Sequence, residues 1–150
     1  MSQYAYMFWL DIIANLWVNS NETEGDAIDN DANGYIDDYK GYNFIDAAGT
    51  LVDDTGHGTH VAGIIAATGN NDIGIIGVAP HAKIMPLRAC SVAGCPVDLI
   101  VQALQYATNN GADIINCSFG GISESKLLND AVTSVINQGV IVIAAAGNDS

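Results

Sequence analysis

Three consecutive stretches decide the fold: Asp113-Ile-Ile-Asn-Cys117, the segment 123–138, and Val140-Ile-Val-Ile-Ala144. The continuous β-branched run at 140–144 is typical of a strand that is buried on both faces. Residues 123–138 carry apolar side chains at helical spacing, and Gly139 ends the predicted helix. A strand, a helix and a strand in this order predict parallel pairing through a right-handed crossover.

The same alternation extends toward the N-terminus. Residues 98–109 predict a helix that has Asp98 at its start and Gly111 just beyond its end. Residues 82–87 predict a short strand, and the small side chains of 61–67 predict a buried helix. We therefore expect an α/β fold, a parallel β-sheet flanked by helices. In such sheets functional residues gather at the carboxyl ends of the strands, here residues 117–121 and 145–148.

Composition narrows the possible partners. The 150 residues suit one domain, and a charged fraction of only 14% suits a compact one. The net charge of −13, from 17 acidic residues against 4 Lys plus Arg, repels nucleic acid and anionic membranes. No apolar stretch is long enough to span a bilayer, so we expect no membrane insertion. Met1 to Leu10 is apolar but has neither the basic region nor the cleavage site of a signal peptide.

Acidic residues concentrate before residue 55, where the chain is rich in turn-forming Asn, Asp and Gly; the sequence divides near Leu51. Asp29-Asn-Asp-Ala-Asn-Gly-Tyr-Ile-Asp-Asp38 resembles the first half of an EF-hand loop, but the position of the usual final Glu falls on Lys40. The alternatives are a simple Asp/Asn turn and a solvated acidic surface. We expect a structural calcium ion and no organic cofactor, and the expected ligands are Asp29, Asp31, Asn33, the Tyr35 carbonyl and Asp37.

The sequence holds three cysteines. Cys90 and Cys95 are close enough to close a small loop between Arg88 and Val97 as a disulfide, and the sequence leaves open whether they do. Cys117 lies in an apolar run and is expected to be a buried free thiol.

Asp54-Thr-Gly-His-Gly-Thr-His-Val-Ala-Gly63 is the strongest chemical signal. A histidine that opens a helix of small residues can present its imidazole as a general base. The first alternative is that both histidines are hydrogen-bonded at a helix start and have only a structural role. Metal binding by His57, His60 and His81 is a further one, but zinc helices usually place a Glu between two histidines four apart.

Several motifs in order resemble the subtilases, the subtilisin-like serine proteases. His57-Gly-Thr-His-Val-Ala-Gly63 resembles their histidine motif, and Ala144-Ala-Ala-Gly-Asn148 resembles the segment that ends in their oxyanion-hole asparagine. Gly77-Val-Ala-Pro80 and Asn116-Cys-Ser-Phe-Gly-Gly121 also match, as do 15–19 and 43–46 upstream. The resemblance implies an incomplete subtilisin-like three-layer sandwich. Its parts would be an atypical N-terminus at 1–10, an acidic calcium-binding insertion at 20–54, as in several subtilases, and an α/β core at 55–150.

The resemblance also implies roles and partners. His57 matches the general base, and Asn148 matches the side-chain donor to the oxyanion. The substrate would be a polypeptide, and secretion is implied by family. The cleft would be built from Ser118, Phe119 and Gly120 and from Ala145, Ala146 and Gly147. Ser118 lacks the G-x-S-x-G elbow of a nucleophile, and Cys117 fits the core better than a thiol nucleophile.

Two members of a Ser-His-Asp triad have no counterpart in the motifs. Met1 to Leu10 contains no Asp, Asp54-Thr-Gly56 adjoins the histidine motif, and Asp11 matches a different family position. The serine motif Gly-Thr-Ser is expected beyond Ser150. We therefore expect a fragment of an active endopeptidase that is inactive alone. The alternatives are a non-catalytic relative that binds calcium or peptides and an unrelated α/β binding domain.

Overall fold

The computed structural model describes residues 10–121 and 124–148, which form two compact units. The first unit ends at Arg88, and the second begins at Ala89. Each unit holds a two-stranded parallel sheet together with α-helix, so the predicted α/β class with parallel strands is confirmed. The atypical N-terminal segment predicted at 1–10 lies, apart from Leu10, outside the described residues.

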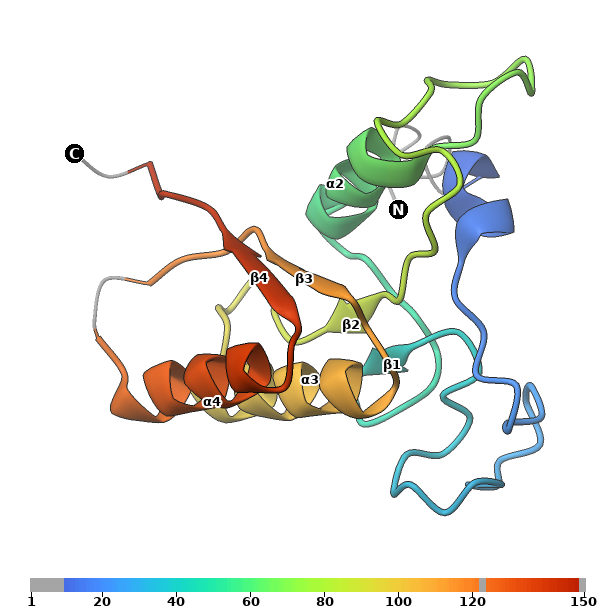
Figure 1. Ribbon diagram of the computed structural model, residues 1–150. Helices are drawn as coiled ribbons and strands as arrows, with labels where there is room; N and C mark the ends of the chain where they lie inside the picture. The colour runs from blue at the N-terminus through green and yellow to red at the C-terminus, as the bar shows by residue number, and fades with distance from the viewer. Residues whose placement is uncertain (1–9, 122–123, 149–150) are drawn as a thin grey trace. The chain divides into compact units, whose positions relative to one another are not determined.

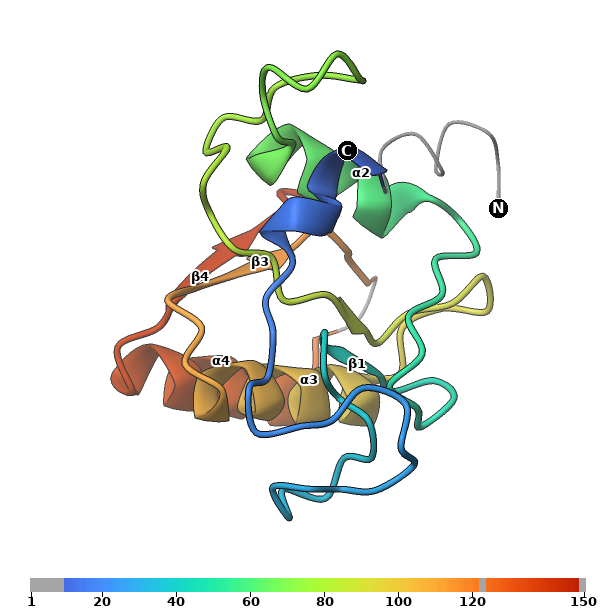
Figure 2. The ribbon, with the colours of Figure 1, turned by 90° about the vertical axis from the view of Figure 1, so that its right-hand side faces the viewer.

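The strands of the second unit are β3 (Ile114–Cys117) and β4 (Ile141–Ala144). They pair in parallel from Ile114 with Ile141 to Cys117 with Ala144. The prediction that residues 140–144 are buried on both faces is wrong in this structure, because the side chains of Ile141 and Ile143 are 55% and 52% exposed. Figures 1 and 2 show the reason: the two helices of this unit lie together on one side of the strand pair, so they cover one face of it.

Helix α3 (Val97–Asn109) precedes β3, and helix α4 (Lys126–Asn137) joins β3 to β4. Side chains at positions 100, 103, 104 and 107 are buried, which is the spacing of a single helix face. Both helices end before a glycine with positive φ, 77° at Gly111 and 92° at Gly139. The hydroxyl of Ser125 caps α4 by accepting the Leu128 N–H, so this helix begins later than the sequence predicted.

Among its described residues, the first unit has little regular structure apart from helix α2 (His57–Ala66). Its strands β1 (Tyr42–Asn43) and β2 (Leu87–Arg88) are two residues each and pair in parallel. The predicted strand at 82–87 is thus reduced to an isolated bridge at Ile84 and the first residue of β2. Pro86 explains the interruption, because it accepts a bond from the Tyr42 N–H but has no N–H of its own to donate.

The structure shows the state of all three cysteines. Cys117 is a buried free thiol, as predicted, and its burial raises the pKa of that thiol. Cys90 and Cys95 form a disulfide, which closes the small loop before α3.

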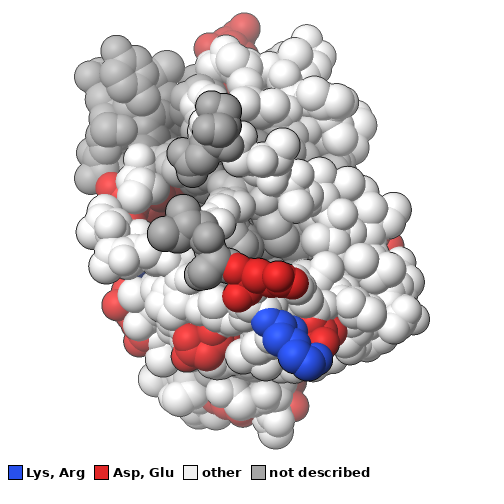
Figure 3. All heavy atoms as spheres, turned by 90° about the vertical axis from the view of Figure 1, so that its left-hand side faces the viewer, with Lys and Arg blue, Asp and Glu red and all other residues white. Residues whose placement is uncertain are grey.

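The surface reflects the composition. On the face shown in Figure 3, acidic side chains are spread widely and basic ones are confined to one place. The helices of the described residues are too short or too polar to cross a membrane.

Candidate functional site

His57 is the first residue of α2, and its side chain is exposed. The residue before it, Gly56, has φ 75°, a left-handed conformation that glycine adopts without strain. The helix begins at His57, four residues before the run of small residues at 61–67 from which it was predicted.

One carboxylate organises this helix start. Oδ1 of Asp53 accepts the Gly56 N–H at 2.8 Å, and its Oδ2 accepts the Thr59 N–H at 2.8 Å and the Thr59 hydroxyl at 2.6 Å. Partial burial raises the pKa of Asp53, but the hydrogen bonds from Thr59, Gly56 and Thr55 outweigh it and leave the pKa below its usual value. The carboxylate is therefore held in its ionised form.

The far end of α2 is tied to the rest of the first unit by a buried amide. Nδ2 of Asn15 donates to the Ala66 carbonyl at 2.9 Å and to the Pro80 carbonyl at 2.8 Å. Asn15 lies in the upstream segment that resembles the family, but the sequence did not indicate this role, because its partners are more than fifty residues away.

The two candidate cleft segments of the second unit follow β3 and β4. Ser118 and Phe119 are half-buried and Gly120 is exposed, whereas residues 145–148 are all exposed. Strand pairing continues into the second segment, because the Ala145 N–H donates to the Cys117 carbonyl at 3.1 Å. The hydroxyl of Ser118 accepts a hydrogen bond from the Asn116 amide at 2.8 Å. The structure thus brings both segments to the same edge of one sheet, as predicted. His57 belongs to the first unit.

An acidic cluster in the first unit has the composition of a cation site. One carboxylate oxygen from each of Glu22, Asp31 and Asp38 lies within 4.8 Å of the others. The amides of Asn19 and Asn33 each donate to both aspartates. Among the described residues no histidine belongs to such a cluster, so the arrangement does not support the zinc alternative.

Glu22 is the unusual member of this cluster. Its side chain is only 6% exposed, and Oε1 accepts the N–H groups of Asn30 and Asp31 at 2.7 and 3.1 Å. Oε2 is buried and has no hydrogen-bond partner among the described residues. A buried oxygen of this kind is costly unless a ligand satisfies it.

The predicted calcium ligands separate into different roles. Asp31 is in the cluster, and the Asn33 amide contacts it. The carboxylates of Asp29 and Asp37 accept backbone N–H groups, from residues 33 and 34 and from residues 25 and 27 respectively. For Tyr35 the predicted ligand is the backbone carbonyl, whereas its ring packs edge-on against the rings of Tyr42 and Phe44. The EF-hand pattern did not include Glu22, because it lies seven residues before the pattern begins.

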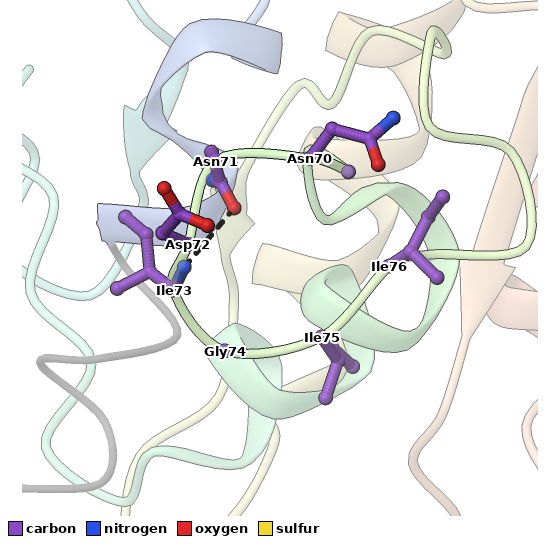
Figure 4. A pocket seen from close by; sticks show the side chains of 8 residues that line it. Asn70, Asn71, Asp72, Ile73, Gly74, Ile75 and Ile76 are labelled. Atoms are coloured by element: carbon purple, nitrogen blue, oxygen red, sulfur yellow. Dashed lines mark hydrogen bonds between the residues drawn. The ribbon is translucent and has the colours of Figure 1, made fainter.

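Asp11 has a role in the fold. It is fully buried, and its carboxylate accepts the Asn71 amide and the Ile75 N–H, each at 2.9 Å. These bonds hold the loop 69–76, which curves around a cavity of about 380 Å³ (Figure 4). Gly74 has φ 55°, and a Cβ there would overlap Asp11 Oδ2. The Asp11 carboxylate is thus occupied by hydrogen bonds to the loop 69–76.

Comparison with known proteins shows the family of the chain. The model of the subtilase family of peptidases matches residues 12–150. The chain belongs to the subtilase family. It is 43% identical over 110 residues to the minor extracellular protease Epr of Bacillus subtilis (strain 168), covering 73% of this chain and 17% of the relative. It is also 35% identical over 142 residues to subtilisin-like protease 1 of Plasmodium berghei (strain Anka), covering 93% of this chain and 24% of the relative.

Solved subtilases show the same local fold. Fervidolysin from Fervidobacterium pennivorans, a keratinolytic enzyme related to subtilisin, superposes with a TM-score of 0.62 at 34% identity. The match covers 73% of this chain and 18% of fervidolysin. The subtilase chain therefore spans less than a quarter of the length of each of these three relatives.

Proposed function

We propose that the subtilase chain is part of a serine endopeptidase that cleaves polypeptides, with His57 as its general base. The observation that supports this proposal most is that His57 is exposed at the start of α2. It lies in the family's histidine motif, within the segment 12–150 that the family model matches. An imidazole on a rigid helix start can take the proton of an attacking serine hydroxyl and return it to the leaving amine. The serine and aspartate partners belong to motifs that the 150 residues do not contain.

The second unit would supply the oxyanion donor and the cleft. The Asn148 amide would donate to the oxygen that becomes negative as the tetrahedral intermediate forms. Segments 118–120 and 145–147 follow neighbouring parallel strands. Their backbone groups would pair with an extended substrate as an added strand, which orients the scissile bond.

A chimera tests this function. Residues 12–150 replace the matching segment of an active subtilase, which supplies the missing serine and aspartate, and hydrolysis of a peptide substrate is measured. We expect an active chimera in which His57→Ala lowers kcat by roughly 10⁴–10⁶ and Asn148→Ala by roughly 10²–10³, the sizes known from a subtilisin. His81→Ala, an exposed histidine outside the motif, is the control and should leave kcat unchanged.

The same experiment decides against the non-catalytic alternative. A folded chimera without activity, or one whose activity ignores His57→Ala, would contradict the protease proposal. The chain would then be better described as a binding relative of the family.

We further propose that Glu22, Asp31 and Asp38 hold a structural calcium ion. Calcium binds six to eight oxygens, and carboxylates are its usual protein ligands. The cationic side chains of the first unit are engaged elsewhere, Lys40 with Glu24, Lys83 with the Ala14 carbonyl and Arg88 with Asp46 and Asp54. The buried, unpartnered Oε2 of Glu22 supports a ligand at this point.

Calcium titration by calorimetry tests this site. Glu22→Gln should weaken binding about tenfold or more, because it removes one charge from the ligand set. It should also stabilise the calcium-free protein, because it removes repulsion between neighbouring carboxylates. Glu24→Gln is the matched control, since Glu24 is exposed and paired with Lys40. Equal losses in both variants, or no binding at millimolar calcium, would contradict the site.

Secretion is the third proposal. One relative is named an extracellular protease, and the Cys90–Cys95 disulfide suits an oxidising compartment. Detection of the native protein in the medium and not in cell extract would support it, and the reverse would contradict it.

A further inference from the structure

We propose that Asp53 is a positioning residue for His57: its carboxylate fixes the backbone on both sides of the histidine and thereby the direction of the imidazole. This inference rests on the proposed role of His57 as the general base. It concerns a residue that the sequence motifs did not single out.

The helix start needs an outside acceptor. The first N–H groups of a helix have no partner within the helix and are usually satisfied by the side chain of the residue before it. In α2 that residue is Gly56, which has no side chain. Asp53 reaches in from three residues earlier and accepts both the Gly56 N–H and the Thr59 N–H at 2.8 Å.

The hydrogen bonds of Asp53 reach the backbone on both sides of His57. Oδ1 of Asp53 also accepts the Thr55 hydroxyl at 3.2 Å, and Thr55 Oγ1 in turn accepts the His57 N–H at 3.2 Å. Oδ2 accepts the Thr59 hydroxyl at 2.6 Å. The backbone before His57, its own N–H and the backbone after it are therefore all connected to one carboxylate.

This network exceeds what a helix cap requires. In α4 the described residues show one side-chain cap bond, from the Leu128 N–H to Ser125 Oγ. His57 is exposed in the structure, so we expect its rotamer to depend strongly on the backbone from which the side chain projects. A catalytic group that is displaced by about 1 Å can lose about 10²-fold in rate, so such precision has a functional value.

The test measures the His57 side chain directly, in the isotope-labelled chain. Three-bond couplings report the χ1 rotamers by nuclear magnetic resonance. We expect one dominant rotamer in the native chain and averaging over two or more rotamers in Asp53→Asn and Asp53→Ala. The couplings of His60, one turn later on the same helix, should change little.

Control variants separate positioning from stability. Asp54→Asn changes the neighbouring carboxylate, which pairs with Arg88, and Ser125→Ala removes the cap of α4. Both should leave the His57 couplings unchanged. If Asp53→Ala does not fold, Thr59→Val removes one bond to the carboxylate, and Thr59→Ser should restore the native couplings.

The chimera described above supplies a kinetic readout. There Asp53→Asn should lower kcat by about 10- to 100-fold with little change in KM, whereas Asp54→Asn should leave both within about twofold. Unchanged His57 couplings in a folded Asp53→Ala chain would overturn the proposal. An inactive parent chimera would contradict the protease function alone, because the rotamer measurement does not depend on activity.

Discussion

Arg88 Nη2 lies 3.0 Å from Asp54 Oδ2, so the end of β2 is tied to the segment that leads into His57. The other guanidinium nitrogen, Nη1, lies 2.9 Å from Asp46 Oδ2. The Arg88 side chain is only 15% exposed, and its Nε is buried without a hydrogen-bond partner among the residues that the structure describes. Both carboxylates are more exposed. The pairing therefore joins two loops to a nearly buried cation.

Arg88→Met should lower the free energy of unfolding by about 1 kcal/mol, because exposed carboxylates contribute little each and the methionine keeps part of the packing. The loss should shrink at high salt, which screens the native pairs. Urea unfolding at low and high ionic strength checks this. Lys126→Met breaks an exposed pair within α4 and should cost less than about 0.5 kcal/mol. A larger loss in Lys126→Met than in Arg88→Met would refute the prediction.

Asn15→Ala should destabilise the first unit by about 2–3 kcal/mol, because it leaves the buried Ala66 carbonyl and the half-buried Pro80 carbonyl without this donor. The midpoint of urea unfolding measures this. Gln105→Ala, an exposed change on α3, should leave the midpoint nearly unchanged. Similar midpoints for Asn15→Ala and the native chain would show that water replaces the amide.

The stability conferred by Asp53 should depend on pH. Its pKa in the folded chain lies below the ordinary value of 3.8, so the folded state favours the ionised form. The contribution is therefore fully present above the unfolded pKa and is lost as the pH falls through the lower folded pKa. Urea midpoints between about pH 5 and pH 2.5 should fall more steeply for the native chain than for Asp53→Asn. Parallel curves would contradict the shift.

The Cys90–Cys95 disulfide should add about 2 kcal/mol, the chain-entropy value for so short a loop. The double variant Cys90→Ser with Cys95→Ser should lose this amount in thermal unfolding. In the native chain, a thiol reagent should detect Cys117 alone and slowly, because burial raises the pKa of that thiol. Rapid reaction of three thiols in the native chain would exclude the disulfide.

Part of the fold was predictable because it depends on local pattern. The apolar spacing within residues 98–109 predicts α3, and the apolar runs at 113–117 and 140–144 predict β3 and β4. The structure places all three elements within a few residues of the prediction. The burial of β4 was not predictable in this way, because a β-branched run says that a strand exists and not which neighbours cover it.

The candidate site likewise has parts that short sequence patterns predict and parts that depend on contacts between distant residues. By itself the sequence determined the family, the histidine motif and the segments after β3 and β4, because each of these is a short contiguous pattern. Only the tertiary structure decided that Glu22 joins Asp31 and Asp38 and that Asn15 anchors the end of α2. These contacts join residues from 7 to 65 positions apart, and a contact across such a separation leaves no periodic pattern in the sequence.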